Sequence, residues 1–284
     1  MKTIVVATFL FASIAVSQIA AQSSIVQIWP AGKMPGKNTD QPESDLPARP
    51  DGVRRITNVS TPTLEVFPAA KKNSPAFIVV PGGGYSYVSY SKEGTEIAKW
   101  LNDNGITAAV LKYRVPDQRD NAFADVQRAI RLARSNAKAW NIDPKRLGLM
   151  GFSAGGHASV RASTNFNNAS YLSIDSIDKL SVRPDFVVLV YPAYLEKEGI
   201  IVPAVNLKAK IPPTLIVVAE DDRTYAMSSK VYHAELDKAG VSNKLIVYPS
   251  GGHGFGLKSD KEVKVWPDAA LEWLRAVKVL KGRK

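Results

Sequence analysis

The chain alternates short apolar runs, rich in β-forming residues, with longer stretches in which apolar residues recur every three or four positions. The apolar runs predict strands over Thr63–Phe67, Ala76–Val80, Thr107–Lys112, Arg146–Met150, Asp185–Tyr191, Thr214–Ala219 and Lys244–Tyr248. The amphipathic stretches predict helices over Thr95–Asn104, Ala122–Trp140, Ser153–Ser163, Ser228–Ala239 and Trp266–Leu280. Because the strands are almost continuously apolar, we expect an α/β fold with a mostly parallel sheet that helices cover on both faces.

The first 60 residues do not follow this alternation. A basic start, an apolar run from Thr3 to Val16 and small residues up to Ala21 predict a signal peptide over residues 1–21. An uncleaved membrane anchor is the alternative, although the run is shorter than the roughly 20 residues that span a bilayer. Residues 22–60 contain five prolines and predict an extended Pro-rich arm, followed by a single domain over residues 61–284. We therefore expect a secreted or periplasmic protein with no stable membrane insertion after signal cleavage.

Composition removes several classes of chemistry. The 284 residues include no Cys, which excludes disulfides, thiolate metal sites and a Cys nucleophile. The formal net charge is +11, but the basic residues are scattered and no nucleic-acid motif accompanies them, so we expect no nucleic-acid partner. Only His157, His233 and His253 can supply an imidazole.

In parallel sheets the chemistry lies beyond the carboxyl ends of the strands, and a G-x-S-x-G sequence stands at such a position. Gly151–Gly155 follows the strand Arg146–Met150 and opens a helix. A serine that projects above a sheet needs a sharp, strained turn, and glycines two residues away on either side relieve the crowding in that turn. This context favours Ser153 as a nucleophile over the alternative of a helix-capping serine.

A second glycine run is placed to stabilise negative charge. Acyl transfer passes through a tetrahedral oxyanion that needs backbone N–H donors held in position beforehand. Ala154, at a helix N-terminus, offers one donor, and the Gly82–Gly84 run after the strand Ala76–Val80 can offer others. Tyr85, which ends this run, is a further candidate for substrate binding. A phosphate-binding loop is the alternative, but its G-x-x-x-x-G-K-[ST] pattern is missing.

A general base and an acid follow the last two strands. His253 lies in the glycine-rich loop Ser250–Gly256, which is typical of a residue that approaches a partner closely and not of a core histidine. Glu220, Asp221 and Asp222 follow the strand Thr214–Ala219, and any of them could orient the imidazole. We favour Asp222, because the loop should turn toward His253 two or three residues past the strand.

The other two histidines have more ordinary interpretations. His157 lies one helical turn after Ser153, and we expect it to be a structural residue. His233 lies within a predicted helix, and we expect it at the surface. The adjacent acids lack a histidine at ligand spacing, so we expect no metal and no cofactor.

The chain order Ser153, Asp222, His253 resembles that of the α/β-hydrolase superfamily, and more narrowly that of small exported bacterial esterases related to acetyl xylan esterases and other carbohydrate esterases. The supporting stretches, which extend over nearly all of the chain after residue 21, are Ile28-Trp29-Pro30, Val80–Tyr85, Leu111–Arg114, Gly151–His157, Arg183–Phe186 and Gly251–Gly256. The resemblance implies the Ser153, Asp222, His253 triad and oxyanion donors from Gly83, Gly84 and Ala154. Lipase-type esterases carry His before the glycines, where this chain has Pro81.

These features predict a serine esterase that cleaves short acyl groups, acetyl first, from an acetylated plant polysaccharide such as xylan or from its oligosaccharides. Only residues 192–213 separate two strands at the point where α/β-hydrolases insert a lid, so we expect a small lid or none. The alternatives are a peptidase of the prolyl-oligopeptidase kind, a generic short-chain carboxylesterase, and a non-catalytic binding module.

Overall fold

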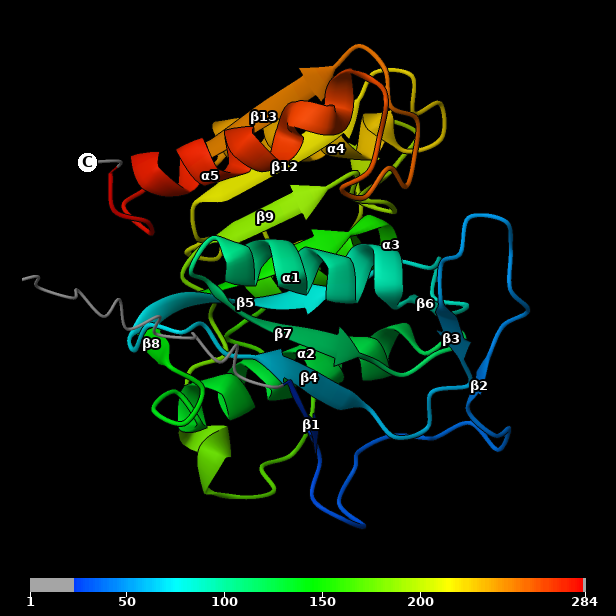
Figure 1. Ribbon diagram of the computed structural model, residues 1–284, viewed down its shortest axis with the longest axis vertical. Helices are drawn as coiled ribbons and strands as arrows, with labels where there is room; N and C mark the ends of the chain where they lie inside the picture. Colours follow the sequence, from blue (N-terminus) through cyan, green and yellow to red (C-terminus); the bar gives the residue numbers. More distant parts are fainter. Residues whose placement is uncertain (1–22, 283–284) are drawn as a thin grey trace, which may run out of the picture.

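A computed structural model describes residues 23–282, and the signal peptide predicted over residues 1–21 lies outside the described residues. The centre of the domain is an eight-stranded sheet in the order β1-β4-β7-β5-β8-β9-β12-β13 (Figure 1). The strands are β1 (Ser24–Gln27), β4 (Thr63–Phe67), β5 (Ser74–Val80), β7 (Thr107–Lys112), β8 (Ile142–Phe152), β9 (Val187–Val190), β12 (Thr214–Ala219) and β13 (Asn243–Tyr248). All neighbours from β7 to β13 pair in parallel, whereas β1 and β4 form an antiparallel edge.

Helices cover both faces of this sheet, as the sequence predicted. They are α1 (Glu96–Asp103), α2 (Arg119–Ser135), α3 (Ser153–Thr164), α4 (Ala226–Lys238) and α5 (Trp266–Ala276). Figure 1 shows α1 and α5 in front of the sheet and α2, α3 and α4 behind it. The indole rings of Trp100 in α1 and Trp266 in α5 lie 5.6 Å apart, which joins the two front helices.

The buried strands explain the continuous apolar runs. Every residue of β5, β9 and β12 is buried, because each of these strands has neighbours on both edges and helices on both faces. The edge strand β13 alternates between exposed and half-buried positions instead. The predicted α/β fold is therefore confirmed, with β4 and β1 as its antiparallel margin.

Several short elements did not show in the hydrophobic pattern. The arm contributes β1 to the main sheet. In a small second sheet, β3 (Arg55–Thr57) pairs with β2 (Ser44–Asp45) on one edge and with β6 (Val88–Ser89) on the other. A hairpin of β10 (Glu196–Lys197) and β11 (Ile200–Ile201) lies between β9 and β12. Strands of two or three residues are too short to display a period of two, so their sequences carry no signal.

Two helices end earlier than the amphipathic pattern predicted. Helix α2 ends at Ser135 and not at Trp140, and α5 ends at Ala276 and not at Leu280. At the end of α5, Lys278 adopts a φ of 62° and Val279 N–H donates to the Leu274 carbonyl. This left-handed closure stops the helix while the apolar pattern continues.

The arm is tied to the domain by a buried charge cluster. The side chains of Arg114 and Asp125 are both fully buried, and Arg114 Nη2 lies 2.8 Å from Asp125 Oδ1. The indole N–H of Trp29, from the arm, donates to the same carboxylate oxygen over 2.7 Å. Arg128 Nε adds a 2.9 Å hydrogen bond to the carbonyl of Ile28. The arm is thus held by partners that are withdrawn from water.

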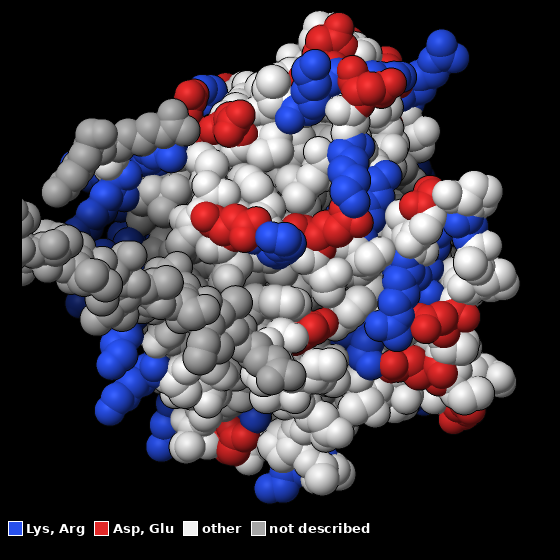
Figure 2. All heavy atoms as spheres, viewed as in Figure 1, with Lys and Arg blue, Asp and Glu red and all other residues white. Residues whose placement is uncertain are grey.

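The exposed surface over α1 is charged with both signs. Figure 2 shows acidic and basic side chains side by side there, and the ion pairs Lys99–Asp103 and Lys258–Glu96 account for part of this pattern. Within residues 23–282, no helix has the length and apolar character required to cross a bilayer.

The charge cluster yields a prediction about stability. Replacing Asp125 with Ala leaves the Arg114 guanidinium and the Trp29 N–H without their acceptor, which should lower the free energy of unfolding by about 3–5 kcal/mol. Denaturant unfolding followed by tryptophan fluorescence measures this loss. The control Lys99→Ala removes only an exposed pair and should change stability by less than about 0.5 kcal/mol. Equal effects of the two substitutions would contradict the anchoring role of Asp125.

Candidate active site

Ser153 occupies a strained turn between β8 and α3. Its φ is 49°, in the left-handed region that a serine seldom adopts. A Cβ atom at Gly151 would lie 2.4 Å from Ser159 Oγ, and one at Gly155 would lie 2.1 Å from the Val80 carbonyl oxygen. Both glycines are therefore required by close packing around the turn, which presents the Ser153 hydroxyl at the carboxyl end of the sheet.

His253 bridges the serine and a carboxylate. Its Nε2 lies 2.8 Å from Ser153 Oγ, and its Nδ1 lies 2.7 Å from Asp222 Oδ2. With a proton on Nδ1, the imidazole donates to Asp222 and accepts the Ser153 hydroxyl proton at Nε2. The structure thus brings together the three residues that the sequence placed after β8, β12 and β13.

Asp222 is held as an ionised carboxylate. Burial raises its pKa, but the hydrogen bond and charge of His253 and the backbone N–H groups of Tyr225 and Thr224 outweigh burial and lower the pKa overall. The Tyr225 and Thr224 N–H groups donate to Asp222 Oδ1 over 3.0 and 3.3 Å. One oxygen is thus held by the backbone while the other faces the imidazole.

The neighbouring acids have different partners. Asp221 Oδ1 accepts the backbone N–H groups of Gly251 and Gly252 over 2.9 and 2.7 Å, so this carboxylate holds the backbone of the His253 loop. Glu220 instead pairs with Lys230 at the surface, over 2.6 Å. Of the three acids left open by the sequence, the structure brings only Asp222 to the imidazole.

The glycine run after β5 lies beside Ser153 with its N–H groups available. Gly83 and Gly84 adopt φ values of 130° and 64°, which L-residues with side chains rarely adopt. Within the described residues, the N–H groups of Gly83, Gly84 and Ala154 donate to no protein acceptor. The N–H of Gly82, in contrast, donates to Glu93 Oε2 over 2.8 Å. The three free donors are those expected for an oxyanion.

Tyr85 does not face the substrate space. Its side chain is fully buried, and its hydroxyl lies 2.7 Å from His157 Nδ1. Burial, followed by the charges of Arg161 and Arg119, lowers the pKa of His157 to about 3, so this imidazole is neutral. The expected structural role of His157 agrees with this contact. The side chain of Tyr85 differs from the expectation of substrate binding, because the turn at φ 63° directs it into the core.

His233 is half-buried on α4, where its Nδ1 contacts the side-chain oxygen of Asn243. It takes no part in the site around Ser153.

A buried carboxylate connects the glycine run to the His253 loop. Glu93 lies in a single π-helical turn, Ser91–Thr95, and its Oε1 accepts the Tyr191 hydroxyl over 2.8 Å. That hydroxyl in turn accepts the N–H of Gly256 over 3.1 Å. Burial raises the pKa of Glu93, and the hydrogen bonds from Tyr191 and Gly82 and the charges of His253 and Lys92 oppose it.

Ser153 and His253 line a hollow of about 400 Å³. Tyr194 and Tyr225 also line it, and their rings lie 5.3 Å apart. The other lining side chains are mostly polar and come from the arm and from the segment between β5 and α1: Asp51, Arg55, Tyr87, Ser89, Lys92 and Glu93.

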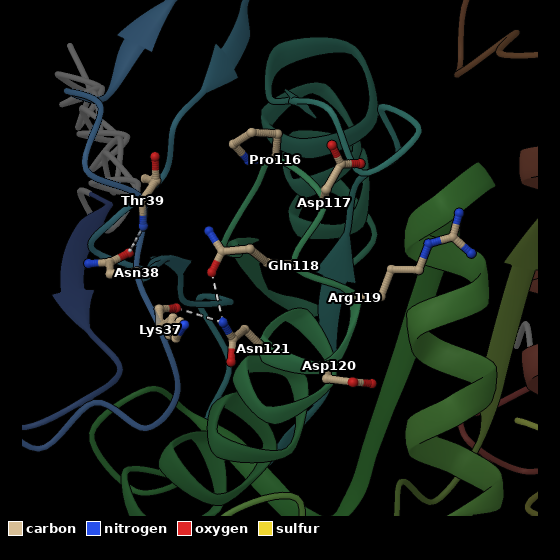
Figure 3. A pocket seen from close by; sticks show the side chains of 9 residues that line it. All are labelled: Lys37, Asn38, Thr39, Pro116, Asp117, Gln118, Arg119, Asp120 and Asn121. Atoms are coloured by element: carbon tan, nitrogen blue, oxygen red, sulfur yellow. Dashed lines mark hydrogen bonds between the residues drawn. The ribbon is translucent and has the colours of Figure 1, made fainter.

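A larger hollow of about 590 Å³ lies between the arm and residues 116–121, where the Asn121 side chain donates to the Lys37 carbonyl over 2.8 Å (Figure 3). It contains none of the triad residues, so the chemistry belongs to the smaller hollow.

Sequence reasoning missed most of the hollow's lining and the buried support. Tyr191 directly follows β9 in the structure, but the apolar pattern extended the predicted strand through Tyr191, so the rule that found Ser153 did not select it. Glu93 follows no strand and lies in a polar stretch, and Asp51 and Arg55 belong to the arm. No local pattern marks these three residues as neighbours of Ser153.

Several known proteins are similar to this chain in sequence. The BD-FAE family model matches residues 64–192. An acetylxylan esterase of Xylanibacter ruminicola is 36% identical in an alignment that covers 64% of this chain and 41% of that protein. An endo-1,4-beta-xylanase B of Butyrivibrio fibrisolvens is 29% identical over 66% of this chain and 34% of its own. The chain spans less than half the length of these two relatives.

Solved structures match over nearly the whole fold. An acetyl ester-xyloside bifunctional hydrolase from Caldicellulosiruptor lactoaceticus is 30% identical, with a TM-score of 0.78 over 93% of this chain and 100% of its own. A Thermogutta terrifontis esterase, 20% identical with a TM-score of 0.69 over 79% of this chain and 92% of its own, shares the fold. The Caldicellulosiruptor lactoaceticus hydrolase is matched at 30% identity over the whole of its own chain. This chain therefore belongs to the α/β-hydrolase family of esterases.

Proposed function

We propose that this protein is a serine esterase that removes short acyl groups, acetyl above all, from the hydroxyl groups of xylan or its oligosaccharides. The observation that carries the proposal is the line from Asp222 through His253 to Ser153, with contacts of 2.7 and 2.8 Å, beside three free backbone donors. From the predicted signal peptide we infer that the enzyme acts outside the cytoplasm.

The geometry supports acyl transfer in two halves. Ser153 Oγ attacks the ester carbonyl carbon while its proton passes to His253 Nε2. The N–H groups of Gly83, Gly84 and Ala154 stabilise the resulting oxyanion, and the imidazolium, paired with Asp222, protonates the departing alcohol. Water then enters, gives its proton to His253 and attacks the acyl-serine, which releases the acid and restores the Ser153 hydroxyl.

The hollow favours a small acyl group on a polar alcohol. Its volume is about 400 Å³, and much of its lining is polar or charged. Only the β10–β11 hairpin and short loops lie between β9 and β12, where a lid for a long alkyl chain would stand. The xylan-related names of two relatives and of one solved structure point to the same substrates.

The direct test is a product assay. The purified protein should release acetate from acetylated xylan and cleave 4-nitrophenyl acetate faster than the octanoate ester. Ser153→Ala should lower kcat by about 10⁵-fold or more, because the nucleophile is gone. Absence of hydrolysis of any ester would refute the esterase proposal, and faster cleavage of an aminoacyl amide than of the acetyl ester would favour a peptidase.

Substitutions of the two adjacent aspartates should have different effects on kcat. Asp222→Asn puts an amide against Nδ1 and favours the wrong imidazole tautomer, which should lower kcat on the order of 10⁴-fold. Asp221→Asn keeps one oxygen for the Gly251 and Gly252 N–H groups and should lower kcat by no more than about tenfold. Steady-state kinetics on 4-nitrophenyl acetate decide the assignment, and similar losses in the two variants would discard it.

Glu93 acts in this scheme as a positioning residue. It accepts the N–H of Gly82, next to the oxyanion donors, and holds the His253 loop through Tyr191 and Gly256. The ring of Tyr191 also packs against the imidazole, with centroids 5.0 Å apart. One carboxylate therefore sets the relative position of the oxyanion donors and the base.

Removing this support should slow the chemical step without weakening substrate binding. Glu93→Gln and Tyr191→Phe should each lower kcat roughly tenfold to hundredfold, while KM changes less than about threefold, because misplaced donors act on the transition state. Tyr232→Phe, which alters a buried hydroxyl with no hydrogen-bond partner in the described chain, is the control. A rise in KM with kcat preserved would show that Glu93 serves binding and not the chemical step.

A further inference from the structure

The N-terminal arm reaches the hollow that contains the nucleophile. Asp51 and Arg55 line the same space as Ser153 and His253, although they precede the domain core in the chain. Arg55 is 8% exposed, on β3. The adjacent Arg54 is not among the lining residues, since its side chain is 56% exposed and pairs with Asp45. The arm therefore turns one of two consecutive arginines toward the site.

Arg55 is held rigidly by the arm itself. Its Nη1 donates to Asp51 Oδ1 and to the Val53 carbonyl, each over 3.1 Å, and its Nη2 donates to the second oxygen of Asp51. Its guanidinium carbon lies 6.0 Å from the centre of the Tyr87 ring. A two-point pair of this kind is planar and fixed in direction. The Asp51 side chain remains 46% exposed, so its carboxylate can accept further hydrogen bonds.

Two aromatic side chains also line the hollow. Tyr194 and Tyr225 face it, and the Tyr225 ring lies 4.8 Å from the His253 ring. A pyranose has apolar C–H faces that pack on aromatic rings and a rim of hydroxyls that bond to planar charged groups. An alkyl alcohol would offer the Asp51 carboxylate no hydrogen-bond donor in place of the water that it displaces, which is costly. An anionic group would meet a guanidinium already neutralised by Asp51.

We propose that Asp51 and Arg55 form a subsite that hydrogen-bonds hydroxyl groups of the sugar whose ester is cleaved, with Tyr194 and Tyr225 packing on the sugar ring. The inference rests on the proposed esterase function and goes beyond it. It makes the arm the element that selects a carbohydrate alcohol over other alcohols.

The test compares two esters with the same acyl group. Asp51→Asn and Arg55→Lys should lower the ratio of kcat/KM for acetylated xylo-oligosaccharides to that for 4-nitrophenyl acetate by about tenfold or more, because only the sugar loses hydrogen bonds. Arg54→Gln is the matched control on the neighbouring residue and should leave both rates within about twofold of the unaltered enzyme. Asp51 is partly exposed, so its variant tests the subsite even where Arg55→Lys fails to fold.

A binding measurement separates failure of the subsite from failure of the esterase proposal. Calorimetry of xylotetraose with Ser153→Ala should show binding that is about tenfold weaker when Asp51→Asn is added. If the unaltered protein cleaves no ester, the proposed function fails, and this calorimetric comparison alone decides the subsite. The subsite proposal would be overturned if Asp51→Asn lowered kcat/KM equally on both esters, so that their ratio stayed unchanged. It would also be overturned if Ser153→Ala bound xylotetraose equally well with and without Asp51→Asn.

Discussion

The site depends on one constraint, which is that a single imidazole must meet a serine and a carboxylate that come from different strands. His253 is 100 residues from Ser153 and 31 from Asp222, yet both contacts are below 3 Å. A parallel sheet satisfies this requirement because the carboxyl ends of β8, β12 and β13 all open at the same edge. The buried strand β9 lies between β8 and β12 and holds their ends at a fixed spacing, while β13 pairs directly with β12. The close-packed turn at Ser153 then directs its hydroxyl toward the imidazole.

Three carboxylates share the work of fixing the loops at this edge, and each has a different kind of partner. Asp222 faces the ring of His253, Asp221 accepts two N–H groups of the loop that carries this histidine, and Glu93 accepts the N–H of Gly82. Glycine loops expose N–H groups and carboxylate oxygens accept hydrogen bonds, so Asp221 and Glu93 each stabilise a loop that would otherwise leave donors unpaired. Of the acids after β12, only Asp222 contacts the imidazole.

The chemistry was visible in the sequence where it followed a strong backbone requirement. Gly151 and Gly155 are needed by packing distances that no side chain permits. An apolar run precedes each triad residue, and the runs that end β8 and β12 are fully buried. Tyr85 shows the limit of this reasoning. Its place beside the glycine run suggested substrate contact, but the direction of its side chain depends on a positive φ and on the buried partner His157. Neither the φ nor the partner can be inferred from neighbours along the chain.

The parts that the sequence did not reveal are those that depend on long-range contacts with the arm. Residues 22–60 lack any periodic signal, yet Trp29 reaches Asp125 across 96 positions and Arg55 lies in the hollow beside Ser153. An esterase whose segment between β9 and β12 contains little more than one short hairpin has little chain there from which to build a wall for its alcohol. The arm supplies lining residues that this segment does not, and the buried Arg114–Asp125 pair holds the start of the arm against the domain. The arm also joins the main sheet through β1 and pairs with β6 through β3, so backbone hydrogen bonds as well as side-chain contacts fix its position beside the hollow.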